Sequence, residues 1–168
     1  MTVFLCGFMG CGKTTTGQIL AAKLGIHYID MDEYIIKKEN KSIPEIFSQN
    51  GEDYFRMKET EAVSELAQHD AVIACGGGAM INDKNAEIAR SNGVVVFLDV
   101  PFNVCYDRIS GDSNRPLIAN NTKQQVEEIY NSRYKIYRKN SSVTVNADNS
   151  PSVVADEIKK SIQIFSGR

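Results

Sequence analysis

Short apolar runs alternate with amphipathic stretches along most of the chain. Five of the runs have the length of strands, and they lie at about residues 3–6, 26–29, 71–75, 94–99 and 143–146. Helical periodicity fills the segments between and after them, at about residues 18–24, 33–38, 43–49, 51–66, 83–91, 101–109, 123–139 and 151–165. Strands that alternate with helices predict an α/β fold with a five-stranded parallel sheet, covered by helices on both faces.

Local signals mark several helix ends. Residues 42–45, Ser-Ile-Pro-Glu, form a capping box with proline in the first turn, which predicts a helix that begins at Ile43. Gly25 is expected to end the first helix. The polar stretch at about residues 110–121 has no pattern of buried positions and is the one long loop expected in the chain. Long loops in compact domains are often functional, and we expect this one to be a lid.

The first predicted strand leads into residues 7–14, Gly-Phe-Met-Gly-Cys-Gly-Lys-Thr, which fit the phosphate-loop pattern G-x-x-x-x-G-K-S/T. Glycines let backbone N–H groups turn toward an anion, and the following helix directs the positive end of its dipole to the same place. Lys13 supplies a mobile positive charge for the β- and γ-phosphates, and the Thr14 hydroxyl is a hard ligand for Mg²⁺. The alternative, a glycine-rich turn that fits by accident, is disfavoured by the flanking strand and helix. We predict a nucleoside-triphosphate site that includes Gly10, Cys11, Gly12, Lys13, Thr14 and Thr15.

Two carboxylates, Asp30 and Asp32, follow the second predicted strand. If the chain is still extended there, both side chains point the same way. Beside a triphosphate, one carboxylate suits Mg²⁺, through water, and the other suits an acceptor hydroxyl. The alternative is that Asp32 caps the following helix and Asp30 is an ordinary surface charge.

Glu59 is predicted to lie on the inward face of its helix. Apolar residues surround it at i−4, i+3 and i+7, and an unpaired carboxylate would be costly there. Arg56, three residues earlier, is the available partner. Because a guanidinium has donors to spare, this pair could hold an acidic substrate, and a purely structural ion pair is the alternative.

Further arginines and a run of three glycines extend the candidate site. Arg133 lies at the edge of the apolar face of its helix, directed toward the body of the domain, although such an arginine can also extend to solvent. Gly76, Gly77 and Gly78 permit close approach of the backbone to a ligand, with a plain flexible turn as the alternative. Arg115 could reach the transferred phosphate or be a solvated loop charge. Arg108 could stack on an adenine ring.

Composition limits the class of protein. The chain has 168 residues, 42% of them hydrophobic, which suits one domain covering residues 1–168. A net charge of −2 argues against nucleic acid or an anionic membrane as the main partner. No apolar run approaches the roughly 20 residues of a membrane span, so we expect a cytoplasmic protein. The cysteines have no zinc or disulfide spacing. We expect Cys11 to be partly exposed and reactive, and Cys6, Cys75 and Cys105 to be buried.

These segments, in this order, resemble the shikimate kinase family across essentially the whole chain. The resemblance is carried by residues 7–17, 30–32, 54–56 with Glu59, 76–78, 114–117 and 133–137. Each segment alone is shared with other small kinases, but their order and spacing together are specific to this family.

The resemblance implies a three-layer P-loop kinase fold, similar to that of nucleoside-monophosphate kinases, with strand order 2-3-1-4-5. It also implies ATP-dependent phosphorylation of the 3-hydroxyl of shikimate, a step toward chorismate and the aromatic amino acids. By the same resemblance Lys13 and Thr14 hold phosphate and Mg²⁺, Asp30 orders the waters of the metal, and Asp32 receives the acceptor hydroxyl.

The resemblance also assigns the acceptor site. Arg56 and Arg133 would clamp the shikimate carboxylate, Glu59 would orient Arg56, and the glycine triplet would close over the ring. The implied substrate-binding set, centred on about residues 31–60, is Asp32, Phe47, Phe55, Arg56, Glu59, Gly76, Gly77, Gly78 and Arg133. Arg115 would be the lid arginine, and Arg108 and Pro151 fall where adenine would bind.

Two rival classes remain at this point. A gluconate kinase or a nucleoside-monophosphate kinase would share the phosphate loop and the fold, although two inward arginines favour a small carboxylic acid. A nucleotide-binding regulatory module without turnover is the other rival, but Lys13, Asp32 and Arg115 are all present. The expected partners are shikimate and ATP, with no nucleic acid and no membrane, and the expected assembly is a monomer.

Overall fold

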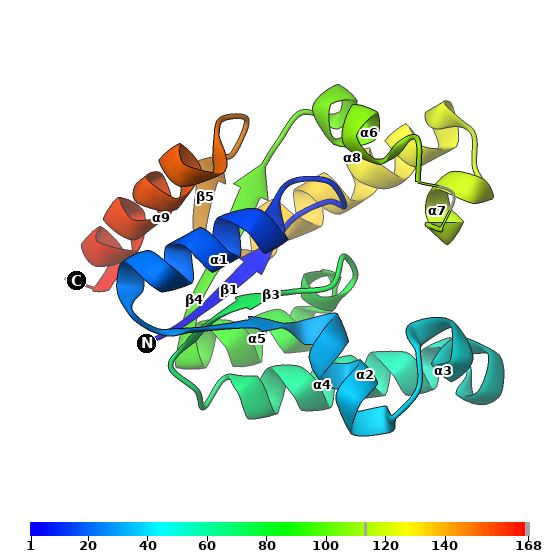
Figure 1. Cartoon of the computed structure of the whole chain (residues 1–168), viewed down its shortest axis with the longest axis horizontal. Coiled ribbons are helices and arrows are strands. Elements are labelled where there is room, and N and C mark those ends of the chain that lie inside the picture. The colour runs from blue at the N-terminus through cyan, green and yellow to red at the C-terminus, as the bar shows by residue number, and fades with distance from the viewer. Residues whose placement is uncertain (113, 167–168) are drawn as a thin grey trace.

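Five parallel strands form one sheet at the centre of the molecule (Figure 1). The computed structural model describes residues 1–112 and 114–166. The strands are β1 (Thr2–Cys6), β2 (His27–Asp30), β3 (Ala71–Ala74), β4 (Gly93–Asp99) and β5 (Val143–Asn146). Their order in the sheet is β2-β3-β1-β4-β5. Each strand falls on a predicted apolar run, and the predicted strand order is confirmed.

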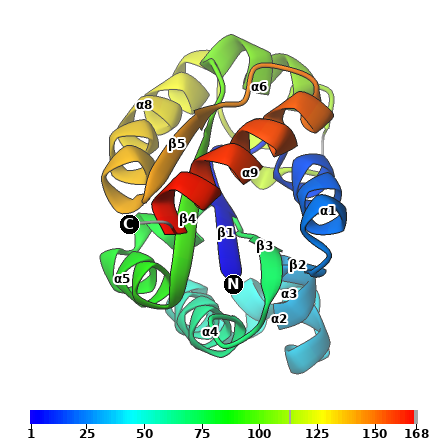
Figure 2. The same cartoon turned by 90° about the vertical axis from the view of Figure 1, so that its left-hand side faces the viewer.

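Helices cover both faces of the sheet (Figure 2). In chain order they are α1 (Lys13–Leu24), α2 (Met31–Glu39), α3 (Ile43–Asn50), α4 (Glu52–Leu66), the short 3₁₀ turn η1 (Ala79–Ile81), α5 (Asp83–Asn92), α6 (Phe102–Ile109), α7 (Pro116–Ala119), α8 (Lys123–Asn140) and α9 (Pro151–Ser166). α1 and α9 pack side by side on one face, whereas α4, α5 and α8 lie on the other. The three predicted layers are therefore present.

The middle strand determines where a site can form. β1 pairs with β3 on one side and β4 on the other, and all its residues are buried. Every strand pairing is parallel, so the carboxyl ends of the strands meet at one edge of the sheet. The phosphate loop follows β1 at this edge, Asp30 ends β2, and the glycine triplet comes directly after the buried Cys75. Ligands of open parallel sheets bind at this edge.

The predicted helix ends agree with the structure at several points. The Ser42 hydroxyl accepts a hydrogen bond from the Glu45 backbone N–H, and the Ser42 N–H donates to the Glu45 carboxylate at 2.7 Å, so the capping box at α3 is confirmed. Gly25 has φ 68° directly after α1, a left-handed conformation that ends helices and favours glycine. Thr122 and Gln125 form a second capping box at α8, which the sequence analysis did not identify.

The polar stretch at about residues 110–121 is only partly a loop. It contains α7, one turn of helix with proline in its first turn, and Leu117 and Ile118 pack partly buried against the core. The prediction of one long loop without core contacts is therefore wrong, because two apolar side chains are enough to dock a single helical turn. Ser113, within this stretch, lies outside the described residues.

Candidate active site

A cavity of about 750 Å³ opens at the carboxyl edge of the sheet. Its wall combines the phosphate loop, the end of β2, the segment after β3, part of α6, the polar stretch and the segment after β5. The predicted site residues that line it are Gly10, Cys11, Gly12, Lys13, Thr14, Thr15, Asp30, Asp32, Gly76, Gly77, Arg108, Arg115 and Pro151.

The phosphate loop folds as its glycines require. Gly10 and Gly12 have φ of 80° and 93°, a region that favours glycine. A Cβ on Gly10 would also lie 2.8 Å from a backbone carbonyl oxygen of α6. α1 begins at Lys13, so Lys13 and Thr14 stand at the positive end of its dipole. Lys13 Nζ donates to the carbonyl of Gly7 at 2.7 Å, which holds the ammonium over the loop. This arrangement is suited to phosphate.

Cys11 is buried, so the prediction that it is partly exposed is wrong. Its exposed fraction is 2%, and its Sγ lies 3.5 Å from Lys13 Nζ. The physical reason is Gly7: a Cβ there would lie 2.8 Å from Cys11 Sγ, so the missing side chain leaves room for the thiol beneath the loop. The other three cysteines are buried as predicted. Burial raises the pKa of the Cys6 thiol to about 12.

The two carboxylates after β2 have different surroundings. α2 begins at Met31, so the chain is not extended from Asp30 to Asp32. Asp30 caps the helix, since its side chain accepts a hydrogen bond from the Glu33 N–H at 3.1 Å. The alternative that gave capping to Asp32 is therefore wrong. Asp32 lies in the first turn of α2, and both carboxylates still line the cavity.

The surroundings of Asp32 make its carboxylate more basic than an aspartate in water. Burial raises the pKa of its carboxyl group, and the negative charge of Asp30 adds to that shift. The positive charges of Lys13 and Arg56 act in the opposite direction. An ionised carboxylate with a raised pKa is a stronger base than one in water, which suits general base catalysis near neutral pH.

Glu59 and Arg56 form an ion pair on the inward face of α4, as the helical spacing predicts. Glu59 is 1% exposed, and its carboxylate accepts a hydrogen bond from Arg56 Nη1 at 2.7 Å. Burial raises the pKa of Glu59, and the neighbouring Arg56 opposes this shift. Arg56 also lies 5.4 Å from the centre of the Phe55 ring. A guanidinium has more N–H donors than these contacts use, so some remain for a ligand.

Gly76 brings two carboxylates together. A Cβ at this position would lie 2.7 Å from Asp32 Oδ1 and 3.4 Å from Glu59 Oε1. The acidic side chains of α2 and α4 therefore occupy the space that any other residue at position 76 would fill. This close approach, rather than flexibility, explains the first glycine of the triplet.

The next two glycines face arginines. A Cβ on Gly77 would lie 3.6 Å from Arg133 Nη1, and one on Gly78 would overlap the guanidinium of Arg56. Tyr137, one turn after Arg133 on α8, donates a hydrogen bond to the Gly77 carbonyl and fixes the triplet against that helix. The structure thus brings both predicted arginines to one short backbone segment.

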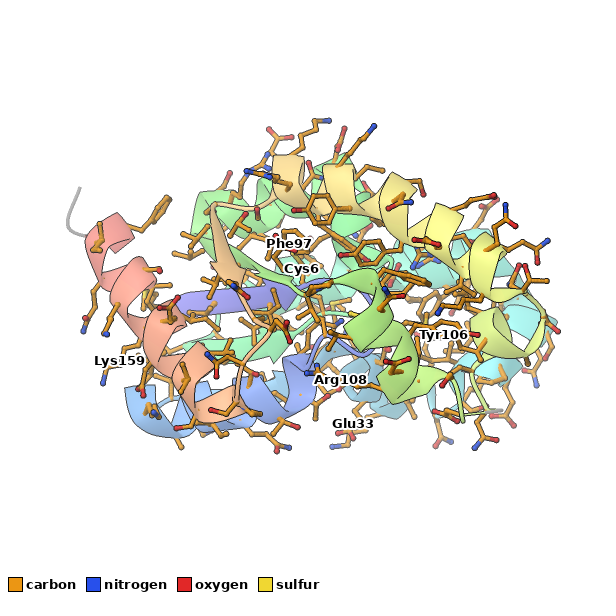
Figure 3. All side chains as sticks on the ribbon, turned by 90° about the horizontal axis from the view of Figure 1, so that it is seen from above. Cys6, Glu33, Phe97, Tyr106, Arg108 and Lys159 are labelled. Atoms are coloured by element: carbon orange, nitrogen blue, oxygen red, sulfur yellow. The ribbon has the colours of Figure 1, made fainter. Side chains whose placement is uncertain are left out.

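Other predicted residues lie at the opposite end of the cavity. Arg108 Nη1 donates to the Gly10 carbonyl at 2.9 Å, and Figure 3 shows Arg108 beside the phosphate loop. Arg115 forms an ion pair with Asp112, with 3.0 Å between Nε and Oδ2. Pro151 begins α9 and lines the cavity. These residues surround the space next to the start of α1.

Further residues line the cavity without a predicted role in binding. Met9, Thr16, Ala147 and Asn149 also face the cavity. Ala147 and Asn149 directly follow β5, and Asn149 Oδ1 accepts a hydrogen bond from the Ser150 N–H at 2.8 Å. The signal that would find them is general: they come after the carboxyl end of a parallel strand.

Phe47 and Phe55 lie outside the set of described residues that line the cavity. Their ring centres are 4.9 Å apart at the contact between α3 and α4. Phe55 is buried, whereas Phe47 is 37% exposed. In this structure Phe55 supports the guanidinium of Arg56, and Phe47 packs on Phe55.

Comparison with known proteins decides among the kinase classes. The shikimate kinase family matches residues 9–163 of the chain. The chain belongs to the shikimate kinase family. A shikimate kinase from Clostridium botulinum is 43% identical over 164 residues, which cover 95% of this chain and 96% of that protein.

Solved shikimate kinases have the same fold. The enzyme from Acinetobacter baumannii, solved in complex with shikimate, has a TM-score of 0.89 and 35% identity, and the match covers 99% of this chain and 94% of that chain. The enzyme from Aquifex aeolicus has a TM-score of 0.87 and 35% identity, covering 99% and 98%. The predicted P-loop kinase fold and the predicted enzyme family are confirmed. Within the part of the chain that the structure describes, no helix is long and apolar enough to cross a membrane.

Proposed function

We propose that this member of the shikimate kinase family transfers the γ-phosphoryl group of ATP to the 3-hydroxyl of shikimate, as a step of aromatic amino acid biosynthesis. One observation carries the proposal. The phosphate loop, Asp32, Gly76 and Gly77 line the same cavity. Directly behind this lining, Glu59, Arg56 and Arg133 surround the segment 76–78, so two carboxylates and two arginines gather beside the cavity. The loop suits a triphosphate, and the cluster suits a small acid that also carries hydroxyl groups, as shikimate does.

ATP would bind along the phosphate loop. The backbone N–H groups at the start of α1 would hold the phosphates, together with Gly10, Cys11, Gly12 and Thr15. Lys13, at the positive end of the helix dipole, would reach the β- and γ-phosphates and stabilise the charge that develops in the transition state. This role is supported by the position of its ammonium over the loop carbonyls.

Mg²⁺ is the proposed metal, and the residues present fit it. The Thr14 hydroxyl and the Asp30 and Asp32 carboxylates supply hard oxygen donors along the cavity wall. Among the described residues, no three His, Cys, Asp or Glu side chains form a cage for an ion. That agrees with Mg²⁺, which keeps several waters and binds through phosphates and one or two protein ligands. Thr14 would bind it directly and Asp30 through water, and the cation would neutralise charge on the phosphates.

Shikimate would bind next to the glycine triplet. Arg56 and Arg133 would hold its carboxylate in a fork geometry, and Glu59 would keep Arg56 oriented. The 2.7 Å bond between Glu59 and Arg56 supports this role. Phe47 and Phe55 would contribute by supporting Arg56 from the side of α3 and α4. The triplet would lie close to the ring, since its residues have no side chains.

Asp32 would act on the hydroxyl that receives the phosphoryl group. Its carboxylate would orient the 3-hydroxyl for in-line attack on the γ-phosphorus and accept its proton as the new P–O bond forms, while ADP leaves with the electrons of the broken bond. The raised pKa of Asp32 supports this assignment. Because the transition state is loose, orientation of the hydroxyl contributes beside proton transfer.

Arg115 would complete the site when the lid, at about residues 110–121, closes. In the structure it is paired with Asp112 on the same stretch, and the Arg115 side chain is 43% exposed. An exposed pair of this kind is weak, so the γ-phosphate can compete with Asp112 for the guanidinium. Arg108 and Pro151 would flank the adenine.

We further propose that the chain is a single domain covering residues 1–168 that works as a cytoplasmic monomer. The acceptor site would lie mainly within about residues 31–60. A net charge of −2 supports small-molecule partners rather than nucleic acid or an anionic membrane.

A coupled assay of ADP release tests the function. The protein is supplied with ATP and Mg²⁺ and, in parallel, with shikimate, gluconate or AMP as acceptor. We expect ADP release when shikimate is the acceptor but not when gluconate or AMP is, and we expect that release to decrease strongly when Mg²⁺ is removed. Release with gluconate or AMP at a comparable kcat/KM, or none with shikimate, contradicts the proposal.

A further inference from the structure

Tyr28, in β2, carries a buried polar atom that has no part in the proposed binding of either substrate. Its hydroxyl is shielded from solvent, and among the described residues it is the one buried side-chain polar group that makes no hydrogen bond of ordinary geometry. An unpaired buried hydroxyl destabilises a fold. If packing alone mattered, phenylalanine would serve better at this position, so the hydroxyl needs a reason.

The ring of Tyr28 lies along α1. A Cβ on Gly17 would lie 2.8 Å from Cε2 and 3.2 Å from Cδ2 of Tyr28, so the ring fills the space that a side chain at position 17 would need. Glycine inside a helix is unfavourable, and this contact accounts for it. Side chains two residues apart on a strand share a face. Asp30, which lines the cavity, therefore shares the face of Tyr28.

Thr14 is the polar side chain of α1 that interacts with the Tyr28 hydroxyl. It comes three residues before Gly17, one turn closer to the start of α1 on the same face. Burial raises the pKa of the Tyr28 phenol, and the adjacent Thr14 side chain acts against that shift. Thr14 also lines the cavity.

A hydroxyl that binds a cation through its oxygen must direct its proton elsewhere, since it has one proton and lone pairs on the same atom. We infer that Tyr28 is a positioning residue for Thr14: the Tyr28 oxygen accepts the Thr14 proton when nucleotide and Mg²⁺ bind, and so directs the lone pairs of Thr14 into the cavity. The inference rests on the proposed function, in which Thr14 is a ligand of Mg²⁺. Nucleotide that binds without metal does not need this acceptor.

Tyr28→Phe tests the inference, because it removes the oxygen and keeps the ring. Calorimetric titration with ADP, with and without Mg²⁺, measures how much the metal tightens nucleotide binding, independently of activity. We expect metal-free ADP to bind as in the wild type, and the tightening to fall about threefold to tenfold, as for one lost hydrogen bond. The unfolding temperature should be unchanged or higher. The matched control is Tyr54→Phe, which removes a hydroxyl bonded to Glu39 outside the cavity lining.

A second variant, Thr14→Val, shows whether the effect passes through Thr14. In that background Tyr28→Phe should cause no further loss of Mg²⁺-dependent tightening. Three outcomes overturn the inference. Mg²⁺ could tighten ADP binding to Tyr28→Phe as much as to the wild type, or metal-free ADP could lose as much affinity as ADP with Mg²⁺. Tyr28→Phe could also reduce the tightening further when Thr14→Val is already present. If the wild type shows no Mg²⁺ effect on ADP yet releases ADP with shikimate, the metal role of Thr14 and the inference fail together, while the kinase function stands.

Discussion

Replacing Gly78 with alanine should weaken the binding of shikimate and leave that of ATP unchanged. Gly78 has φ −95°, which alanine adopts without strain, so the effect comes from the new methyl group. That Cβ would overlap the guanidinium of Arg56, which must shift away from the position in which its Nη1 donates to Glu59 at 2.7 Å. A hydrogen bond to a charged group contributes roughly 1.5–3 kcal/mol. The Arg56 side chain is 35% exposed and partly screened, so the lower half of that range applies.

The displaced guanidinium also loses its charged hydrogen bond to the shikimate carboxylate, for which the same range applies, so KM for shikimate should rise about tenfold to fortyfold, at about 1.4 kcal/mol per factor of ten. Glu59, left buried and unpaired, takes up a proton more readily because burial already raises its pKa, and this limits the loss of stability. Gly77→Ala is the matched control. Its Cβ would lie 3.6 Å from Arg133 Nη1, an ordinary contact distance, so KM should change little.

Steady-state kinetics of ADP release, with shikimate and ATP varied in turn, separates the two constants. Thermal unfolding of each variant shows whether both proteins are folded. An unchanged KM for shikimate in Gly78→Ala, equal effects of the two alanines, or an equal increase in both KM values would refute the role given to Arg56.

Three further outcomes follow from the site. Lys13→Ala should abolish turnover with an unchanged unfolding temperature, because the ammonium stabilises charge on the phosphates and lies outside the core; near-normal kcat would contradict the phosphate site. Arg133→Ala should raise KM for shikimate far more than KM for ATP, because the lost contact between guanidinium and carboxylate is worth roughly 2–4 kcal/mol of binding free energy. Equal effects on the two constants would instead assign Arg133 to the nucleotide site. Because the pKa of Asp32 is raised, kcat/KM should fall as the pH decreases through a pKa above the usual carboxyl value. Asp30→Asn removes a charge that raises this pKa and should move the fall to lower pH, and an unmoved profile would exclude Asp32 as the titrating group.

The sequence predicts the parts of this fold that depend on periodicity and local chemistry. Apolar runs identify every strand of the sheet, and the reason is clearest for β1, β3 and β4, which are almost wholly buried and need such runs. Spacing on one helix is enough to place Glu59 inside and to choose Arg56 as its partner. The capping box at Ser42 is a local hydrogen-bond pattern and can be read from four residues.

The sequence is less informative where tertiary contacts decide. Either Asp30 or Asp32 could cap α2, and the choice depends on where β2 stops, which the sheet determines. Cys11 is buried because Gly7 leaves room under the loop, a contact across four residues that no periodicity records. The helical turn α7 forms because Leu117 packs against the core, although the surrounding residues are polar.

Asp32→Asn, assayed for ADP release with shikimate and for nucleotide binding, tests the central claim most directly. Asn keeps the shape of the side chain and removes the charge and the basicity. The account predicts that kcat falls by at least about two orders of magnitude, the range of a lost general base, while the affinity for ATP with Mg²⁺ is retained. A variant with near-wild-type kcat/KM for shikimate contradicts Asp32 as the group that receives the acceptor proton, and a variant that no longer binds ATP with Mg²⁺ makes it a metal ligand instead.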